Sequence, residues 1–210
     1  PMTHIPRVVL AAAFFLAGSA HAFSEGTGRI SVLPGWRYTP NDFFAGSAQK
    51  AGFPLERASP GGPQLTASFG YMATDAIEIA IELFGGFESL QLQNYGEVTS
   101  VSYGAEVVVR GYFDAGRFHP YLGGGVGPVF AYTTGGDTRD STERLITGYL
   151  VNAGVSWELS DRLALTLDAK WLIARGLVRD IGGVNSGGLW TGIGVTWLLP
   201  GEASRTGSVR

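Results

Sequence analysis

The amino-acid sequence predicts an all-β protein, an eight-stranded antiparallel transmembrane β-barrel with up-and-down meander topology. Three observations lead to this fold class. Apolar and polar residues alternate in eight segments after residue 23, which gives each segment one apolar face and one polar face. The segments are longer than the roughly 5–6 residues of most soluble strands. The connections between them alternate short and long, as the periplasmic turns and external loops of outer-membrane barrels do.

The first 22 residues have the features of a secretory signal peptide. Arg7 supplies the positive charge, Val8–Ala17 is apolar, and Ala20-His21-Ala22 matches the small-x-small cleavage pattern. This apolar stretch is too short for a membrane-spanning helix, which needs roughly 20 residues. We therefore expect a cleaved signal at 1–22, a barrel at 23–199, and a flexible polar tail at 200–210.

The first four expected strands each have apolar residues at alternate positions. Ile30, Val32 and Trp36 alternate with Arg29, Ser31 and Arg37 in the first, where Pro34 and Gly35 suggest a bulge or bend. The third and fourth alternate most clearly, with isoleucine and valine facing one way and glutamate facing the other. The four strands are Gly28–Tyr38, Gln64–Ala73, Ala76–Leu90 and Val98–Phe113.

The last four expected strands follow the same pattern and contain inward-facing glycines. In the fifth, Leu122 and Val126 alternate with Gly123 and Gly125, and the later strands place tryptophan near their ends on the apolar face. These strands are His119–Tyr132, Leu145–Leu159, Leu163–Ala174 and Gly187–Leu199. The long connections are expected at 39–63, 91–97, 133–144 and 175–186.

Charged residues on the polar faces determine which side of the barrel faces lipid. An unpaired charge at the bilayer midplane costs about 2–4 kcal/mol, so the charges must avoid hydrocarbon. Inside an eight-stranded barrel they pair with each other, fill the lumen and use the space left by inward glycines. The expected lumen network is Arg29, Arg37, Glu78, Glu82, Glu106, Arg110, Glu158, Asp168 and Lys170.

A secreted soluble barrel of the lipocalin kind is the alternative fold, since its apolar face would point inward with the same alternation. The membrane barrel explains more, because the outward aromatic residues cluster near strand ends, as interfacial girdles do. The chain has no cysteine, which excludes thiolate zinc sites, and its net charge of -3 gives no sign of nucleic-acid binding.

Four features were weighed as sites of chemistry, and the sequence predicts neither an enzyme nor a cofactor or metal. His119 is the single histidine after residue 22, and we expect an interfacial or turn residue there. Glu78 and Glu82 are expected in an ion network rather than as an acid–base pair. The acidic residues of the loop at 133–144 lack the calcium-loop pattern, and Gly123–Gly127 does not lead into a helix.

Two motifs resemble those of small outer-membrane barrels. One begins at His119-Pro120-Tyr121 and continues through alternating glycines, and the other comprises Asn152–Val155 followed by Asp168-Ala169-Lys170-Trp171. The sequence is thus similar to OmpW-like proteins and to the wider OmpA/OmpX-like transmembrane domains. It departs from them at its end, where Trp197 is followed by thirteen residues instead of closing the chain on an aromatic residue.

The resemblance implies an integral protein of the bacterial outer membrane, exported by a cleaved signal. For OmpW-like members it implies passage of small hydrophobic molecules through the barrel wall. Pro34 and Pro128 remove ladder donors, which either weakens the wall or marks a bulge for curvature. The alternative function is a structural, adhesion or binding role of the external loops. The partners expected are outer-membrane lipids and lipopolysaccharide, periplasmic chaperones and the barrel-assembly machinery, and a small hydrophobic solute.

Overall fold

A computed structural model describes residues 23–39, 49, 52, 54–57, 59–94, 96–135, 142–178 and 182–199. The signal peptide, most of the first long loop, the acidic loop residues Asp137 and Asp140, and the tail at 200–210 lie outside these residues. So does the side chain of Glu143. Within the described part, no helix is long and apolar enough to cross a membrane.

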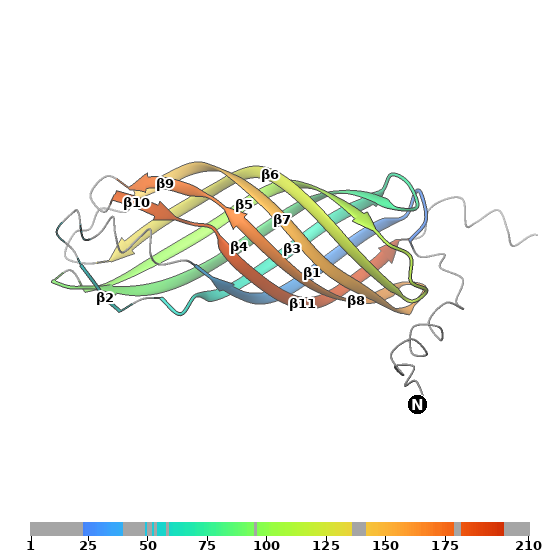
Figure 1. Ribbon diagram of the computed structural model, residues 1–210, viewed down its shortest axis with the longest axis horizontal. Helices are drawn as coiled ribbons and strands as arrows, with labels where there is room; N and C mark the ends of the chain where they lie inside the picture. The colour runs from blue at the N-terminus through green and yellow to red at the C-terminus, as the bar shows by residue number, and fades with distance from the viewer. Residues whose placement is uncertain are drawn as a thin grey trace, which may run out of the picture.

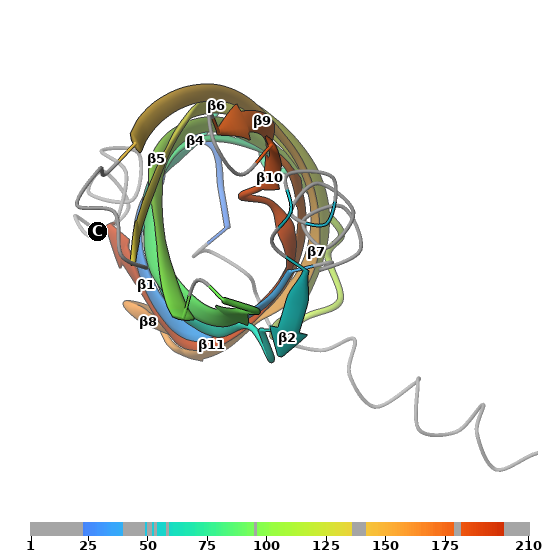
Figure 2. The same ribbon diagram turned by 90° about the vertical axis from the view of Figure 1, so that its left-hand side faces the viewer.

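Eight long antiparallel strands form a closed barrel in meander order, as predicted (Figures 1 and 2). The ring is closed because β1 pairs with β11 as well as with β3, and β4 pairs with both β3 and β5. The eight strands are β1 (Gly28–Tyr38), β3 (Gly62–Met72), β4 (Ile77–Leu92), β5 (Gly96–Tyr112), β6 (Phe118–Gly135), β7 (Thr142–Ser160), β8 (Leu163–Ile173) and β11 (Gly188–Leu199).

Three short strands, which sequence reasoning assigned to loops, lie at one end of the barrel. β2 (Leu55–Arg57) pairs with the end of β4, and β9 (Arg175–Val178) pairs with β10 (Gly182–Asn185) as a hairpin. This end also receives the long connections, and we call it the long-loop end. The opposite, short-turn end has the connections 73–76, 113–117 and 161–162. At one of these turns Gly116 adopts φ +73° and its N–H is bonded to Asp114 Oδ1.

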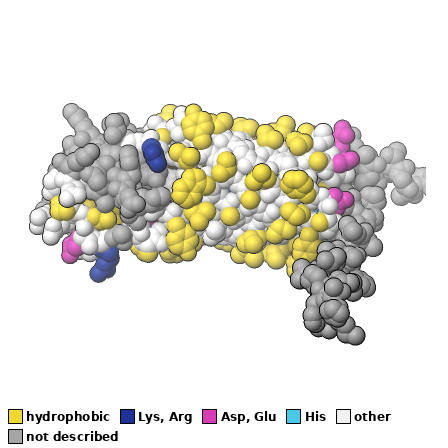
Figure 3. Space-filling model, viewed as in Figure 1, with side chains coloured by type: hydrophobic (Ala, Val, Ile, Leu, Met, Phe, Trp, Pro, Cys, Tyr) yellow, Lys and Arg dark blue, Asp and Glu magenta, His cyan; other side chains and the backbone are white. Residues whose placement is uncertain are grey.

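The outer surface is apolar and the inner surface polar, which confirms the predicted orientation of the strands. Neighbours on β4 show the contrast, since Ile81 is 57% exposed while Glu82 is 1% exposed. On the face drawn in Figure 3, hydrophobic side chains cover the middle of the barrel, and charged ones lie toward its two ends. An apolar band with charges only beyond it is the surface that a membrane barrel needs.

Pro34 in β1 and Pro128 in β6 each interrupt the pairing with one neighbouring strand without forming a bulge. Between β1 and β11, Val32 pairs with Val195 and the next pair is Gly35 with Gly192, so Leu33 and Pro34 are skipped in an unchanged register. A bulge would shift the register, so of the two alternatives predicted at Pro34, a bulge or a bend, the bulge is wrong. The cause of the gap is the missing N–H of proline.

Pro128 produces the same kind of gap between β5 and β6. Gly104 pairs with Val129 and the next pair is Val107 with Val126, so Ala105 and Glu106 have no partners in an otherwise continuous ladder. The register is again unchanged, and the bulge alternative is wrong here as well. The two backbones nevertheless lie close together here. A Cβ added to Gly127 would clash with the Ala105 carbonyl oxygen.

Candidate functional site in the barrel lumen

The lumen is filled by side chains in layers along the barrel axis. The inward positions of β4 give their order from the short-turn end, since Glu78 and Glu82 are followed by Phe84 and then by Glu88. Charged, apolar and again charged side chains therefore occupy successive levels. Each layer is built from several strands, because inward residues at one height come from every strand of the ring.

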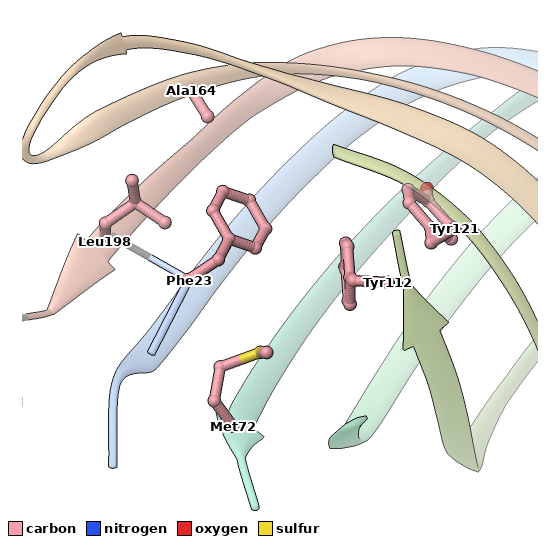
Figure 4. Close-up of a cluster of buried hydrophobic side chains, with 6 residues drawn as sticks. All are labelled: Phe23, Met72, Tyr112, Tyr121, Ala164 and Leu198. Carbon is pink, nitrogen blue, oxygen red and sulfur yellow. The ribbon is translucent and has the colours of Figure 1, made fainter. Parts of the chain in front are cut away.

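An aromatic plug closes the short-turn end. It consists of Phe23, Met72, Tyr112, Tyr121, Ala164 and Leu198, all buried (Figure 4). Phe23 precedes the first strand and is held there because Gly26 N–H donates to the Met72 carbonyl, and Met72 N–H donates to the Thr27 carbonyl. The chain thus turns back into the barrel mouth before β1 begins.

His119 belongs to this plug and not to the interface or to a turn, which corrects the expectation from sequence. It is 2% exposed, and its imidazole stacks on the Phe23 ring with centroids 3.8 Å apart. Its Nε2 lies 3.1 Å from Glu158 Oε1. Glu158, which was predicted within the lumen network, instead pairs with His119 at the periphery of the short-turn end.

The ionic layer lies directly above the plug and contains Arg29, Glu78, Glu82, Arg110, Asp168 and Lys170. Glu78 Oε2 accepts from Arg29 at 3.2 Å, from Arg110 at 3.3 Å and from the Tyr112 hydroxyl at 2.7 Å. Arg29 also lies over the Phe23 ring at 4.3 Å, so the ionic layer and the aromatic plug share this side chain.

Glu82 is the second centre of the ionic layer. Arg110 reaches its Oε2 at 2.5 Å, and Lys170 pairs with its Oε1. Lys170 also lies 3.3 Å from Asp168 Oδ2. Glu78 and Glu82 together bind Arg29, Arg110 and Lys170, and Asp168 joins the layer through Lys170. Buried charges need opposite charges beside them in this way.

Inward glycines make room for these long side chains, as expected from sequence. A Cβ on Gly70 would collide with the Glu78 carboxylate, and one on Gly123 would lie 2.9 Å from Arg110 Cγ. Asn152, which sequence reasoning did not include, completes the layer. In the amide orientation that satisfies both its groups, its oxygen accepts from Arg110 Nε at 3.2 Å.

Glu106 is placed in the lumen as predicted, but it is not tied into the network. It is 3% exposed, pairs directly across the strands with Glu82, and its Oε1 has no hydrogen-bond partner among the described residues. It borders an interior cavity of about 10 Å³, whose lining also includes Glu82 and Lys170. That volume is about the space one water molecule needs, so the cavity is not part of an aqueous channel.

An apolar layer, the upper apolar cluster, separates the ionic layer from the long-loop end. It consists of Phe84, Val108, Val129, Leu150, Leu172 and Ala174. Trp190 lies beside it, 2% exposed, with its ring 4.6 Å from Lys170 Nζ and its Nε1 donating to the Gln64 carbonyl at 3.4 Å. Gly35 and Gly192 leave space for the indole, since a Cβ at either position would collide with it.

Arg37 forms a separate charged pair nearer the long-loop end. Its guanidinium lies 3.6 Å from Glu88, contacts Ser102 and donates to the Ser186 carbonyl at 3.3 Å. Arg37 is thus in the lumen as predicted, but it is apart from the ionic layer. Sequence reasoning missed Glu88, Tyr112 and Trp190, although all three are in phase with the inward positions of their strands.

The carboxylates of the lumen are arranged as an ion network. Among the described residues, no group of three or more histidine, cysteine, aspartate or glutamate side chains is placed to hold a metal ion. The carboxylates of the ionic layer are engaged by arginine, lysine and tyrosine. The arrangement fills the middle of the barrel with paired charges and joins side chains of β1, β5 and β8 to the two glutamates of β4.

Comparison with known proteins identifies the same architecture. A family model described as "Outer membrane protein beta-barrel domain" matches residues 10–187. The chain is similar to the crystal structure of the outer membrane protein OprG from Pseudomonas aeruginosa, with TM-score 0.54, 11% identity, and coverage of 84% of this chain and 97% of that chain.

A second similar structure is Ail, the attachment invasion locus protein of Yersinia pestis, crystallised in complex with the heparin analogue sucrose octasulfate. Its TM-score is 0.51 at 12% identity, with coverage of 83% of this chain and 99% of that chain. At such identities the likeness concerns the fold. No curated protein sequence matches the chain.

Proposed function

The chain belongs to the outer membrane protein beta-barrel family, and we propose that it lets small hydrophobic molecules pass between the upper lumen and the bilayer. It is a bacterial outer-membrane β-barrel protein. The short-turn end would face the periplasm and the long-loop end the exterior, as in other barrels of this membrane. A signal peptide removed during export belongs to the same proposal, as do periplasmic chaperones and the assembly machinery as partners.

The route cannot run straight through the lumen, because the ionic layer and the aromatic plug block it. Moving an apolar solute through this layer would require breaking buried ion pairs, which costs about 3–5 kcal/mol for each carboxylate left without its partner. A hydrophobic solute that enters at the long-loop end therefore meets the upper apolar cluster and has to leave sideways.

The unpaired stretch between β5 and β6 is the observation that supports this exit. Pro128 and Ala105 lie opposite each other there but are not paired, because Pro128 has no N–H to donate, and the inward neighbour of Pro128 is Val129, a fully buried member of the upper apolar cluster. Separating two strands where one hydrogen bond is already missing is less costly than separating them elsewhere, since each ladder bond contributes about 0.5–1.5 kcal/mol.

A reversible disulfide beside this gap tests the proposal. The chain has no cysteine, so Val107→Cys with Val126→Cys creates a single possible bridge at the outward pair that borders the gap, and Pro128 keeps its missing N–H. In proteoliposomes we expect uptake of a hydrophobic fluorescent solute to fall to the level of empty liposomes when the bridge is oxidised and to return on reduction. Undiminished uptake in the oxidised protein would exclude this exit.

The matched control places the same bridge farther from the gap, where the ladder is intact on both sides. Val109 and Gly124 are a directly paired couple on the same two strands, and both face outward. Val109→Cys with Gly124→Cys should leave uptake unchanged on oxidation. If both bridges stop uptake equally, the strands move as a whole and Pro128 has no special part in it.

A second candidate function is binding through the long-loop end. β6 and β7 have 18 and 19 residues, more than the roughly 9–11 that cross a bilayer, so they extend beyond the apolar band. The β9–β10 hairpin lies at the same end (Figure 1). Ail was crystallised with a heparin analogue, and immobilised heparin is a suitable first ligand to test. Binding without any solute uptake would favour this function over the first.

A further inference from the structure

The outer wall carries a groove of about 530 Å³ in its long-loop half. It spans four neighbouring strands, β1, β3, β4 and β5, and its lining is mostly apolar. Its volume falls within the roughly 300–1,000 Å³ of small-molecule sites. The residues that shape it are Pro34, Pro63, Leu65, Gly85, Phe87 and Tyr103.

The groove exists because a glycine occupies an outward position in a row of larger side chains. Leu65 pairs with Gly85 on one side, and Gly85 pairs with Tyr103 on the other, so the glycine lies between two large neighbours. Tyr103 does not cover it, because its ring stacks on Phe130 of β6 with centroids 5.2 Å apart. That contact draws the ring toward β6, away from β4.

Gly85 is not required by the packing of the barrel. A Cβ built there has Tyr103 Cβ as its nearest neighbour, at 3.9 Å, whereas the inward glycines have backbone or side-chain atoms in the way. A glycine inside a strand lowers the stability of the strand. Here it also leaves apolar surface of the groove without a covering side chain. This combination is expected where something other than the chain fills the space.

The position of the groove identifies its occupant. It opens within the apolar band that faces lipid, and Trp36 marks the level just beyond it. The indole Nε1 of Trp36 donates to the Pro60 carbonyl at 3.1 Å, and tryptophan with a bonded N–H is typical of the headgroup level. The groove thus lies at acyl-chain depth in the half of the bilayer nearer the long loops.

We propose that this groove binds one acyl chain of an outer-leaflet lipid. An acyl chain lying along Gly85 contacts Leu65 on one side and Tyr103 on the other. It therefore makes more van der Waals contacts than it would on a flat wall. The site depends on the lipid-facing surface alone. It stands whether or not a solute passes between β5 and β6.

Filling the groove with a side chain tests the proposal. Gly85→Leu places an apolar side chain where the acyl chain would lie. Gly111→Leu is the matched control, because Gly111 is also an outward glycine with no atom within 3.7 Å of an added Cβ. Folding of each variant is judged by heat-modifiable migration on a gel. If Gly85→Leu does not fold, Gly85→Ala takes its place, because it adds only a methyl group.

The measurement is native mass spectrometry of the purified barrel titrated with dipalmitoyl phosphatidylethanolamine. We expect the first lipid to bind at least about tenfold more weakly to Gly85→Leu than to the wild type or Gly111→Leu, with Gly85→Ala between them. Equal binding by all variants would overturn the proposal. A second result would also overturn the proposal. If the wild type is a dimer, and Gly85→Leu makes it monomeric without weakening lipid binding, the occupant of the groove is a second copy of the chain.

Discussion

Arg110 reaches past its direct cross-strand partner and lies 2.5 Å from Glu82. The residue that Glu82 directly faces on β5 is another carboxylate, Glu106. The strand register therefore places two carboxylates opposite each other, and Arg110 compensates the negative charge of Glu82. At the same time it pairs with Glu78 at 3.3 Å, so one guanidinium joins both centres of the ionic layer.

The first prediction concerns this guanidinium. Arg110→Met keeps an unbranched apolar stem and removes the guanidinium, leaving two buried carboxylates short of a partner. We expect the free energy of unfolding in lipid vesicles, measured by urea titration, to fall by about 3–5 kcal/mol. Arg162→Met, at an exposed turn, is the control and should change it by less than about 0.5 kcal/mol. A similar loss for both variants would mean that the ionic layer is not the cause.

The second prediction concerns Glu106, which is buried, faces Glu82 and has an oxygen without a hydrogen-bond partner among the described residues. Glu106→Gln keeps the shape and removes one of two opposed like charges. We expect the free energy of unfolding to stay the same or rise by up to about 1 kcal/mol. Glu78→Gln is the comparison and should destabilise, because it weakens two ion pairs. Destabilisation by Glu106→Gln as well would show that this carboxylate has a stabilising partner.

Much of this lumen could be predicted from the sequence, because the period of a strand is two and one face of each strand is buried. The bounds of the eight long strands agree with expectation to within a few residues, and every member of the ionic layer was named. Glu88 and Tyr112 were missed although they continue the same alternation. Gly85-Gly86 interrupts the alternation just before Glu88, and Tyr112 carries no charge that would require a place in the lumen.

Other features could not be derived from periodicity. The return of Phe23 into the barrel mouth depends on tertiary contacts of an irregular segment, which has no periodic pattern. The stacking partner of His119 comes from that return, although the inward position of His119 itself follows the alternation of β6. A proline in a strand predicts a lost hydrogen bond, but whether the chain adds a residue as a bulge or leaves a gap depends on the register of the neighbouring strand.

The third prediction concerns the aromatic plug. Phe23→Ala removes a ring that touches His119 on one side and lies under Arg29 on the other. We expect a loss of about 3–5 kcal/mol in the free energy of unfolding, the usual cost of removing a buried phenylalanine ring. Phe113→Ala is the control, since this residue lies at the same end of the barrel but is 64% exposed. Equal effects would mean that the plug contributes little to stability.

The last prediction tests which face of the barrel touches lipid. Ile81 lies within the outward apolar row of β4 between Ile77 and Phe87 and is 57% exposed, while Ile77 lies at the short-turn end of β4 and is 38% exposed. We expect Ile81→Arg to lower the free energy of unfolding in lipid vesicles by about 2–4 kcal/mol and Ile77→Arg by about 0–1 kcal/mol, because the cost of a lipid-facing charge falls from the midplane to the interface. A soluble barrel with water on this face would show small, equal effects at both positions. That result would contradict the membrane orientation on which both the lateral exit and the acyl-chain groove depend.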